Sequence, residues 1–226
     1  MNQRLHAIYQ LILPSRGMID VGTDHGYIPV QLAKGGYPGQ ILASDIREGP
    51  LEAAKRSAEN AGVVDRIRFL LCDGLEQCPQ NAVDTIVIAG MGGDTICGIL
   101  DRAEWCMSPE YKLILQPMTK QEVLRYWLVN NGFQLDRELL VKDRGILYQI
   151  LETHFSGENE SLNDAELFVG KYALSCQQPL FGDLLDLECR RVETVLAAKR
   201  IDDPGSDSFL NNIYTELLSM RNDLHG

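Results

Sequence analysis

The junction between the first apolar, strand-like run and the turn after it constrains the fold most. It reads Ile19-Asp20-Val21-Gly22-Thr23-Asp24-His25-Gly26-Tyr27. An apolar segment that gives way to glycines and then to a helical pattern predicts a strand, a tight turn and a helix. Because Gly22 and Gly26 carry no Cβ, the backbone there can approach a bound nucleoside closely. The junction therefore predicts a ligand site at the end of a strand.

The charge of this turn separates it from a dinucleotide fingerprint. Its small positions read Gly22, Asp24 and Gly26, so a carboxylate stands where a pyrophosphate needs a bare amide. A negative side chain repels phosphate and suits a cationic or neutral ligand. S-adenosylmethionine, which has a sulfonium, an ammonium and no phosphate, fits that description. A nicotinamide dehydrogenase is disfavoured for the same reason.

Strand-like and helical patterns alternate over the first two thirds of the chain, which predicts βαβ units and a parallel sheet. A hairpin near the end of this region, turning at Lys142-Asp143-Arg144, adds an antiparallel strand at the edge. Strands are expected over residues 18–21, 41–44, 66–71, 83–89, 112–115, 133–141 and 145–152. Helices are expected over residues 4–13, 28–34, 49–61, 92–100 and 120–130.

Composition shifts near residue 156, where a polar linker begins and strand signals end. Helical spacing follows over residues 163–176, 180–200 and 208–224. We therefore expect two domains, residues 1–155 and residues 156–226, the second being a helical hairpin or short coiled coil.

Charge, cysteines and apolar runs exclude several classes of protein. The net charge of −11 argues against wholesale electrostatic capture of nucleic acid, although a local basic face stays possible. The six cysteines form no CxxC pair and no zinc-type cluster, so we expect reduced thiols and no metal site. Apolar runs are too short to span a bilayer, and the N-terminus lacks a secretory pattern. These features predict a cytoplasmic protein that makes no membrane contact.

Polar or glycine-rich residues follow each of the first four expected strands, at the sheet edge where α/β proteins bind ligands. After the turn at Asp20 come Asp45, then Cys72-Asp73-Gly74-Leu75, then Ala89-Gly90-Met91-Gly92-Gly93. Each also has a purely structural reading, as a backbone acceptor, a helix N-terminal acid, a turn or a loop. Their common position favours one binding cleft.

Five segments resemble the bacterial tRNA (adenine-22-N1)-methyltransferase family. They are Asp20–Pro29, Gly49-Pro50, Asp73-Gly74-Leu75, Ile88–Gly93 and Leu113–Pro117. The resemblance covers about residues 1–152 and continues as a similar helical tail. It implies an α/β, Rossmann-like Class I methyltransferase fold, with a mostly parallel seven-stranded sheet and a small C-terminal helical, coiled-coil-like appendage. It also implies methylation of N1 of an adenine in the tRNA D-arm, with S-adenosyl-L-methionine as cofactor.

The resemblance further assigns roles within the cleft. Asp20, Gly22 and Thr23 would contact the methionine end of the cofactor, next to Gly26, where the backbone can approach the ligand closely. Asp45 and Ile46 would contact the ribose and adenine, and Asp73 and Gly74 the edge of the adenine. Ala89, Gly90 and Met91 would form the floor of the pocket. Asp24 would be the acid nearest the reacting groups, and Tyr27 would be the aromatic residue one helical turn later. The family often has Asn where this chain has Met118, so no role is assigned to Met118.

Methylation of adenine N1 needs alignment above all, because that nitrogen already carries an in-plane lone pair. A nearby carboxylate favours the cationic product, and Asp24 is the candidate. His25 is expected to be structural. The target base must leave its stack, and Tyr27 either stacks on it or packs against the following helix.

The expected partner is tRNA rather than DNA, and the protein is expected to be a monomer or weak homodimer. RNA-contacting cations are expected at Arg4, Lys34, Arg47, Lys120, Arg125, Lys142 or Arg144, with a second stripe at Lys171, Arg190, Arg191, Lys199 and Arg200. Two alternatives stay open: a methyltransferase with a non-tRNA substrate, and a non-catalytic cofactor-binding protein.

Overall fold

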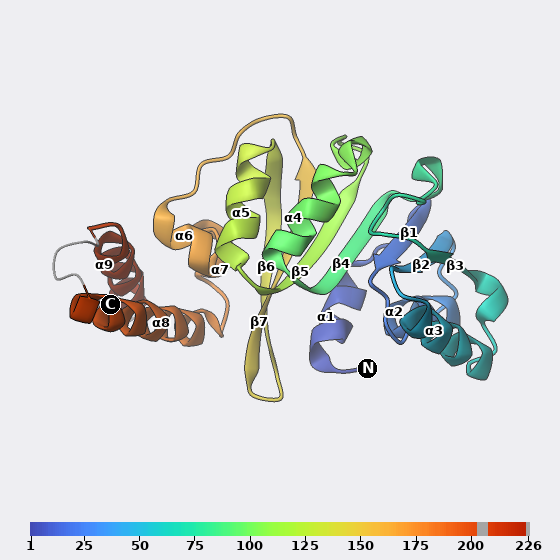
Figure 1. Cartoon of the computed structure of the whole chain (residues 1–226), viewed down its shortest axis with the longest axis horizontal. Coiled ribbons are helices and arrows are strands. Elements are labelled where there is room, and N and C mark those ends of the chain that lie inside the picture. Colours follow the sequence, from blue (N-terminus) through green and yellow to red (C-terminus); the bar gives the residue numbers. More distant parts are fainter. Residues whose placement is uncertain (203–207, 225–226) are drawn as a thin grey trace.

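The computed structural model describes residues 1–202 and 208–224, without the side chains of residues 199–202. A seven-stranded sheet in the order β3-β2-β1-β4-β5-β7-β6 forms its centre (Figure 1). The strands are β1 Gly17–Val21, β2 Gln40–Asp45, β3 Ile67–Leu71, β4 Thr85–Gly92, β5 Lys112–Thr119, β6 Phe133–Asp143 and β7 Ile146–Phe155. The helices are α1 Gln3–Leu11, α2 Tyr27–Lys34, α3 Glu48–Asn60, α4 Gly93–Asp101, α5 Gln121–Asn130, α6 Asp164–Val169, α7 Tyr172–Ser175, α8 Phe181–Asp202 and α9 Ser208–Asp223. Short 3₁₀ turns lie at Val64–Arg66, Gln80–Ala82 and Glu104–Cys106.

The sheet confirms the expected mostly parallel, seven-stranded layout. Strands β1 to β5 pair in parallel, whereas β7 runs antiparallel to both β5 and β6. The antiparallel strand is therefore one place in from the edge, which β6 occupies. The hairpin turns at Arg144-Gly145, not at Lys142-Asp143-Arg144, because both residues take positive φ (50° and 83°), as a two-residue hairpin turn with the twist of its strands requires.

Alternate residues of the central strands feed two separate cores. Met18, Ile41 and Val87 pack on one face with α1, α2 and α3. Ile19 and Ile86 pack on the other face with α4 and α5. Burial on both faces explains why these strands read as continuous apolar runs, and it leaves the strand ends as the exposed edge of the sheet.

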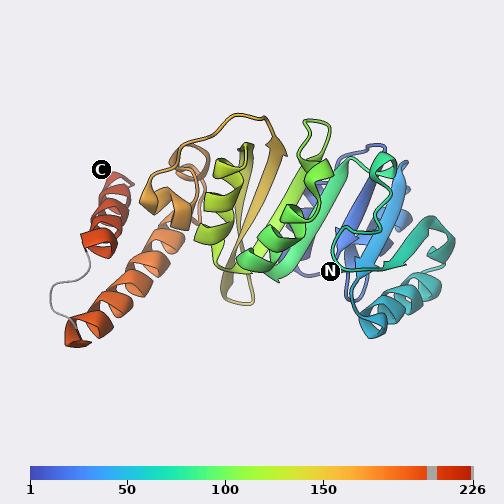
Figure 2. The same cartoon turned by 45° about the horizontal axis from the view of Figure 1, so that its top comes forward.

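The expected C-terminal helices are present, and they lie beyond the β6 edge of the sheet (Figure 2). The stretch expected as one helix over residues 163–176 is divided into α6 and α7 by Gly170. Its φ is 91°, and a Cβ there would lie 2.4 Å from Glu138 Oε2. Helices α6, α8 and α9 share a separate core, which includes Val169, Leu184 and Leu217.

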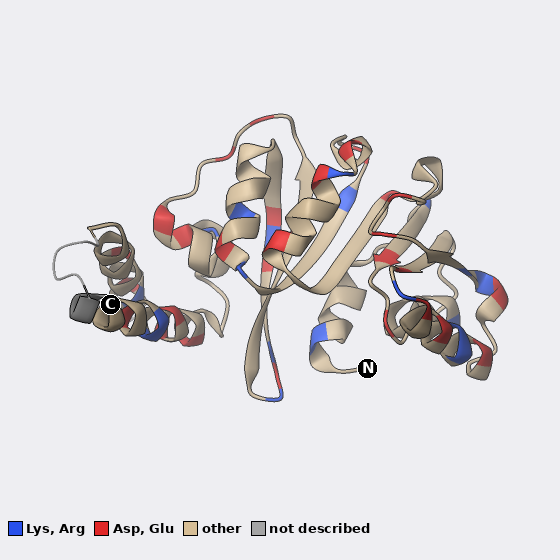
Figure 3. Ribbon diagram, viewed as in Figure 1, with Lys and Arg blue, Asp and Glu red and all other residues tan. Residues whose placement is uncertain are grey.

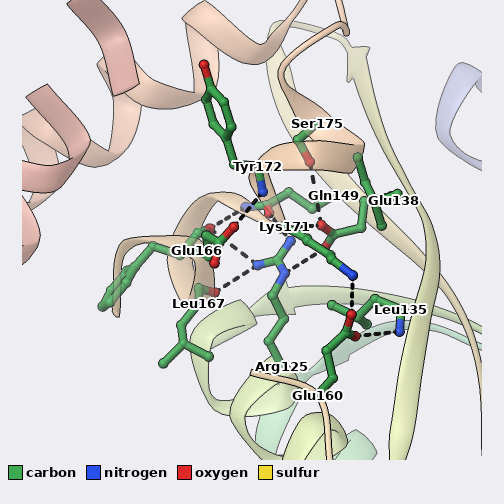
Figure 4. A network of polar contacts seen from close by, with 12 residues as sticks. Arg125, Leu135, Glu138, Gln149, Glu160, Glu166, Leu167, Lys171, Tyr172 and Ser175 are labelled. Carbon is green, nitrogen blue, oxygen red and sulfur yellow. Dashed lines mark hydrogen bonds and ion pairs between the residues drawn. The ribbon is translucent and has the colours of Figure 1, made fainter. Parts of the chain in front are cut away.

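Arg125 joins the sheet to α6, although the sequence placed it at the RNA surface. Its side chain is 1% exposed, with Nε 2.6 Å from Glu138 Oε1 and Nη2 2.5 Å from Gln149 Oε1 (Figure 4). Its Nη1 donates to the carbonyl of Leu167 at 2.9 Å. The expectation that Arg125 contacts RNA was wrong: a guanidinium with no exposed surface cannot meet a phosphate.

Only some cations of the expected second basic stripe are free of ion pairs. Lys171 forms an ion pair with Glu160, and Arg191 lies 3.6 Å from Glu122 and 3.4 Å from Glu188 while covering the ring of Phe168. Arg190 is exposed, and the side chains of Lys199 and Arg200 lie outside the described residues. Among the helices that the structure describes, none has the length and apolarity to cross a membrane.

Candidate functional site

A cavity of about 710 Å³ opens at the carboxyl ends of β1, β2 and β4 and beside the turn after β3. Of the expected cofactor contacts, most meet here, which confirms that the polar strand ends share one cleft. The lining residues that the sequence assigned to cofactor or catalysis are Gly22, Asp24, Asp45, Ile46, Asp73, Gly74, Ala89, Gly90 and Met91. Arg47, which was expected to contact RNA, also lines the cavity. Ser44, Thr95 and Arg102 also line it and were missed.

The backbone amides of the turn after β1 already donate hydrogen bonds within the protein. The N–H groups of Gly22 and Thr23 both donate to the carbonyl of Ser44, at 2.8 and 2.9 Å. The Thr23 hydroxyl donates to Asp20 Oδ2 at 2.7 Å. A pyrophosphate needs such amides free, so this turn is unsuited to a dinucleotide.

Gly22 leaves room that a side chain would fill. Its φ is 73°, and a Cβ there would lie 2.2 Å from Cε of Met91. The Met91 side chain therefore lies against the glycine, and both residues line the cavity. A larger residue at position 22 would displace the Met91 side chain.

Two carboxylates stand at different points of the cavity wall. Asp45 is 7% exposed and accepts a hydrogen bond from the backbone N–H of Arg47 at 2.9 Å, which fixes its orientation. Asp73 is 45% exposed and forms a 2.9 Å ion pair with Arg102. The Asp45 carboxylate is thus held in one orientation, whereas the charge of Asp73 is balanced by Arg102. No sequence pattern links residues 73 and 102.

A smaller cavity of about 250 Å³ adjoins the first. The two share Gly22, Asp24, Ala89 and Gly90. Asp24 stands at their boundary with 68% of its side chain exposed and φ of 48°. The second cavity is completed by Asn2, Arg4, Leu5, Asp20, Thr23, Tyr27 and Ile28. An acid accessible from both compartments can act on a group in one while a ligand fills the other.

The N-terminal helix supplies a cation to the second cavity. Arg4 donates through Nη1 to Oε1 of the buried Gln116, and its guanidinium lies 5.5 Å from the centre of the Tyr148 ring. These contacts hold it close to Gly90, where a Cβ would be 3.5 Å from Nη1. The sequence indicated Arg4 only as an RNA contact, because nothing local to α1 reveals that Gln116 and Tyr148 meet it.

The remaining candidates fall at the rim or outside. Tyr27 is 50% exposed and lines the second cavity, with its ring centre 5.6 Å from that of His25. Gly26 lines neither cavity: a Cβ there would lie 3.0 Å from that of Ala54, so it allows α2 to approach α3. Met118 is 43% exposed, and its sulfur lies 3.7 Å from the Gln116 amide nitrogen.

Asp20 makes folding stability depend on pH. Burial raises the pKa of its carboxyl to about 6 from 3.8, against the hydrogen bond from Thr23 and the charge of Arg4, which both lower it. A raised pKa in the folded state stabilises the fold below pH 3.8, and this contribution is lost as pH rises through 6. Relative to Asp20→Asn, the wild-type protein should lose about 2 kcal/mol of unfolding free energy between about pH 4.5 and about pH 7.5. Urea unfolding of both proteins at the two pH values checks this, and a constant difference would contradict it.

Residues 1–151 match the methyltransferase-domain family. The chain is also 29% identical, over 170 residues, to the tRNA (adenine(22)-N(1))-methyltransferase of Bacillus subtilis (strain 168). The aligned part covers 75% of this chain and 71% of that protein.

Solved structures resemble the whole chain. A candidate tRNA (m1A22) methyltransferase of Streptococcus pneumoniae, in complex with S-adenosyl-L-methionine, superimposes with a TM-score of 0.82 at 26% identity, covering 96% of this chain and 98% of that one. The m1A22 tRNA methyltransferase of B. subtilis gives a TM-score of 0.79 at 26% identity, covering 100% of this chain and 97% of that one. The likeness includes the C-terminal helices.

Proposed function

The chain belongs to the methyltransferase-domain family, and we propose that it is a tRNA (adenine-22-N1)-methyltransferase that uses S-adenosyl-L-methionine. The observation that carries this proposal is the pair of adjoining cavities with Asp24 at their boundary. A methyl transfer between two bound molecules needs one compartment for the donor, one for the acceptor and an opening between them. The whole-chain likeness to m1A22 methyltransferases supports the choice of tRNA as substrate.

The larger cavity suits the methyl donor. In this assignment Asp45 receives the ribose hydroxyls, Ile46 flanks the adenine, and Asp73 and Gly74 meet the adenine edge. Its polar wall is acidic, and the amides of the β1 turn are occupied, so the wall suits a ligand that is positively charged and lacks phosphate.

The methionine end of the donor lies toward the second cavity in this assignment. Asp20, Gly22 and Thr23 hold it, above the floor made by Ala89, Gly90 and Met91. Gly26 supports this geometry indirectly, through the contact between α2 and α3.

In this assignment the smaller cavity holds the methionine end of the donor at Asp20 and Thr23 and receives the target base at Leu5, Tyr27 and Ile28. Tyr27 at its rim offers an aromatic face, and the apolar side chains of Leu5 and Ile28 line its wall. A base reaches this site only when it has left its stack, which costs a few kcal/mol. Contacts with Tyr27 repay part of that cost.

The cofactor supplies a methyl group bonded to a positively charged sulfur. The protein has to align adenine N1 with that group, and the shared edge of the two cavities does so. Positive charge develops on the base as N1 is alkylated. The Asp24 carboxylate stabilises that charge and accepts a proton from the exocyclic amine. The Nε2 atom of His25 lies 3.8 Å from Asp24 Oδ2, but His25 lines neither cavity, so its role is structural.

Residues 1–155 form the catalytic domain and residues 156–226 the helical domain, with α6 held on the first by Arg125 and α7 by Glu138. The protein works on tRNA in the cytoplasm, not on DNA or at a membrane. It is a monomer or a weak homodimer.

Calorimetry combined with methyl transfer tests this function. Purified protein should bind S-adenosyl-L-methionine and its demethylated product, fail to bind a nicotinamide dinucleotide, and transfer labelled methyl groups to unmodified tRNA. Binding without transfer to any RNA would favour the non-catalytic alternative, and transfer only to other macromolecules would favour the non-tRNA alternative.

A further inference from the structure

The β6–β7 hairpin projects past the rest of the sheet, between α1 and α8 (Figure 1). Its turn contains only Arg144 and Gly145, both with positive φ, so its tip is short and conformationally defined. Arg144, Gly145 and Ile146 are all exposed. A tight, exposed tip at this place is suited to contact with a large ligand.

Grooves lie on both sides of the tip. One, of about 360 Å³, is lined by Met1, Asn2, Leu5, Tyr27 and Arg144, and so joins the tip to the rim of the base cavity. The other, of about 560 Å³, is lined by Lys142, Gly145, Ile146, Leu147, Asp183, Asp186, Leu187 and Arg190, and so joins the tip to α8. The hairpin is therefore the link between the catalytic rim and the helical domain.

The charges along this path leave a cationic excess on an acidic protein. Asp183 pairs with Lys142 at 2.9 Å, and Asp186 pairs with Arg221 at 3.3 Å. Arg144 and Arg190 make no ion pair with any of the described residues. Figure 3 shows cations on the hairpin tip, on α1 and on α8. The two acids that line the groove are thus paired. Arg144 and Arg190, together with Asp143 beside Arg144, which is unpaired among the described residues, leave a small cationic excess for an outside partner.

We propose that the hairpin tip is an RNA-backbone-binding element, with Arg144 on the phosphates next to the extruded base and Arg190 on phosphates farther along the same tRNA. This rests on the proposed function and adds to it a path for the RNA. An extruded base is held in place only if its flanking backbone is fixed, and guanidinium groups bind phosphate strongly. Exposed Ile146 and Leu187 add apolar surface beside this path.

Charge favours RNA over a second copy of the chain at this surface. A second copy would bring a net charge of −11 against a protein of the same charge, and repulsion would have to be offset by contacts. A polyanion that follows the two free guanidinium groups instead gains from counterion release.

Three charge reversals test the path. Arg144→Glu, Arg190→Glu and the control Arg68→Glu change the charge equally, and Arg68 is an exposed residue of β3, at the opposite edge of the sheet. Arg144→Glu should weaken tRNA binding about tenfold or more at moderate salt, and Arg144→Lys should restore most of it. Arg68→Glu should change binding less than twofold. Cofactor affinity by calorimetry and the thermal melting temperature should stay unchanged in all of them.

The salt dependence and a shortened RNA sharpen the test. Arg144→Gln should lower the slope of log affinity against log salt by about one. With an isolated D-arm stem-loop, the effect of Arg144→Glu should persist and that of Arg190→Glu should disappear. Binding of Arg144→Glu equal to that of Arg68→Glu would overturn the proposal. So would a wild-type dimer that Arg144→Glu dissociates without a change in tRNA affinity.

The enzymatic function and the RNA contact of the hairpin can be tested separately. If wild-type protein methylates tRNA but the Arg144 variants bind it normally, the hairpin path is wrong and the enzymatic function stands. If wild-type protein transfers no methyl group to tRNA, the enzymatic function is wrong, and the binding measurements still decide whether the hairpin contacts RNA.

Discussion

Replacing Asp24 with asparagine should lower the turnover number by about 10²–10⁴-fold while the dissociation constant for S-adenosyl-L-methionine changes less than about threefold. Asp24 is the acid that both cavities share. Asparagine keeps the side-chain shape and tolerates the φ of 48°, so the turn is preserved and only the charge and basicity are lost. Alanine at this position should lose at least as much activity.

The neighbouring histidine is the matched control for Asp24. His25 belongs to the same turn and is similarly exposed, but it lines neither cavity. His25→Ala should lower turnover less than about tenfold. Single-turnover methyl transfer with saturating tRNA and cofactor measures the effect, and calorimetry measures cofactor binding. An Asp24→Asn protein that retains more than a tenth of wild-type turnover would remove Asp24 from the chemistry.

Replacing Arg125 with methionine should destabilise the protein by about 3–5 kcal/mol. The buried Glu138 carboxylate would lose its cationic partner and keep only the Lys171 backbone N–H and the more distant Ser175 hydroxyl (Figure 4). The carbonyl of Leu167 would lose its donor as well. The C-terminal helices should therefore loosen from the sheet, and the connection near residues 156–163 should become more sensitive to protease.

Two further variants separate the buried charge from general damage. Arg137→Met removes a 59% exposed cation on the same hairpin, 3.9 Å from Glu152, and should cost less than about 1 kcal/mol. The double variant Arg125→Met/Glu138→Leu should be more stable than Arg125→Met alone, because no unpaired charge stays buried. Urea unfolding measures all three. A double variant less stable than the single one would contradict this account of the network.

The sequence predicted the sheet and the cleft well because both follow from local patterns. Apolar runs buried on both faces marked the strands, and polar residues directly after them marked the edge where Asp45 and Asp73 now face one cavity. Parallel strands bring those ends together whatever the loops between them do. The acidic turn at Asp24 likewise depended on neighbouring residues alone.

The errors arose where distant residues decide the environment. Arg125 was placed at the surface because Arg on a helix is usually solvated, whereas its partners Glu138 and Gln149 come from two later strands. Arg102 and Arg4 escaped notice as cavity residues for the same reason, since Asp73 and Gln116 are far from them in the chain. The hairpin turn was placed slightly too early because Arg144 adopts a positive φ that Arg rarely takes.

We propose that one cleft brings a methyl donor to N1 of adenine 22. The most direct measurement uses one tRNA transcript with adenine at position 22 and a second in which only that adenine is replaced by guanine. After incubation with protein and S-adenosyl-L-methionine, reverse transcription and nucleoside mass spectrometry locate the product. We predict 1-methyladenosine and a reverse-transcription stop at position 22 of the first transcript and none in the second; equal methylation of both, or of neither, would contradict the account.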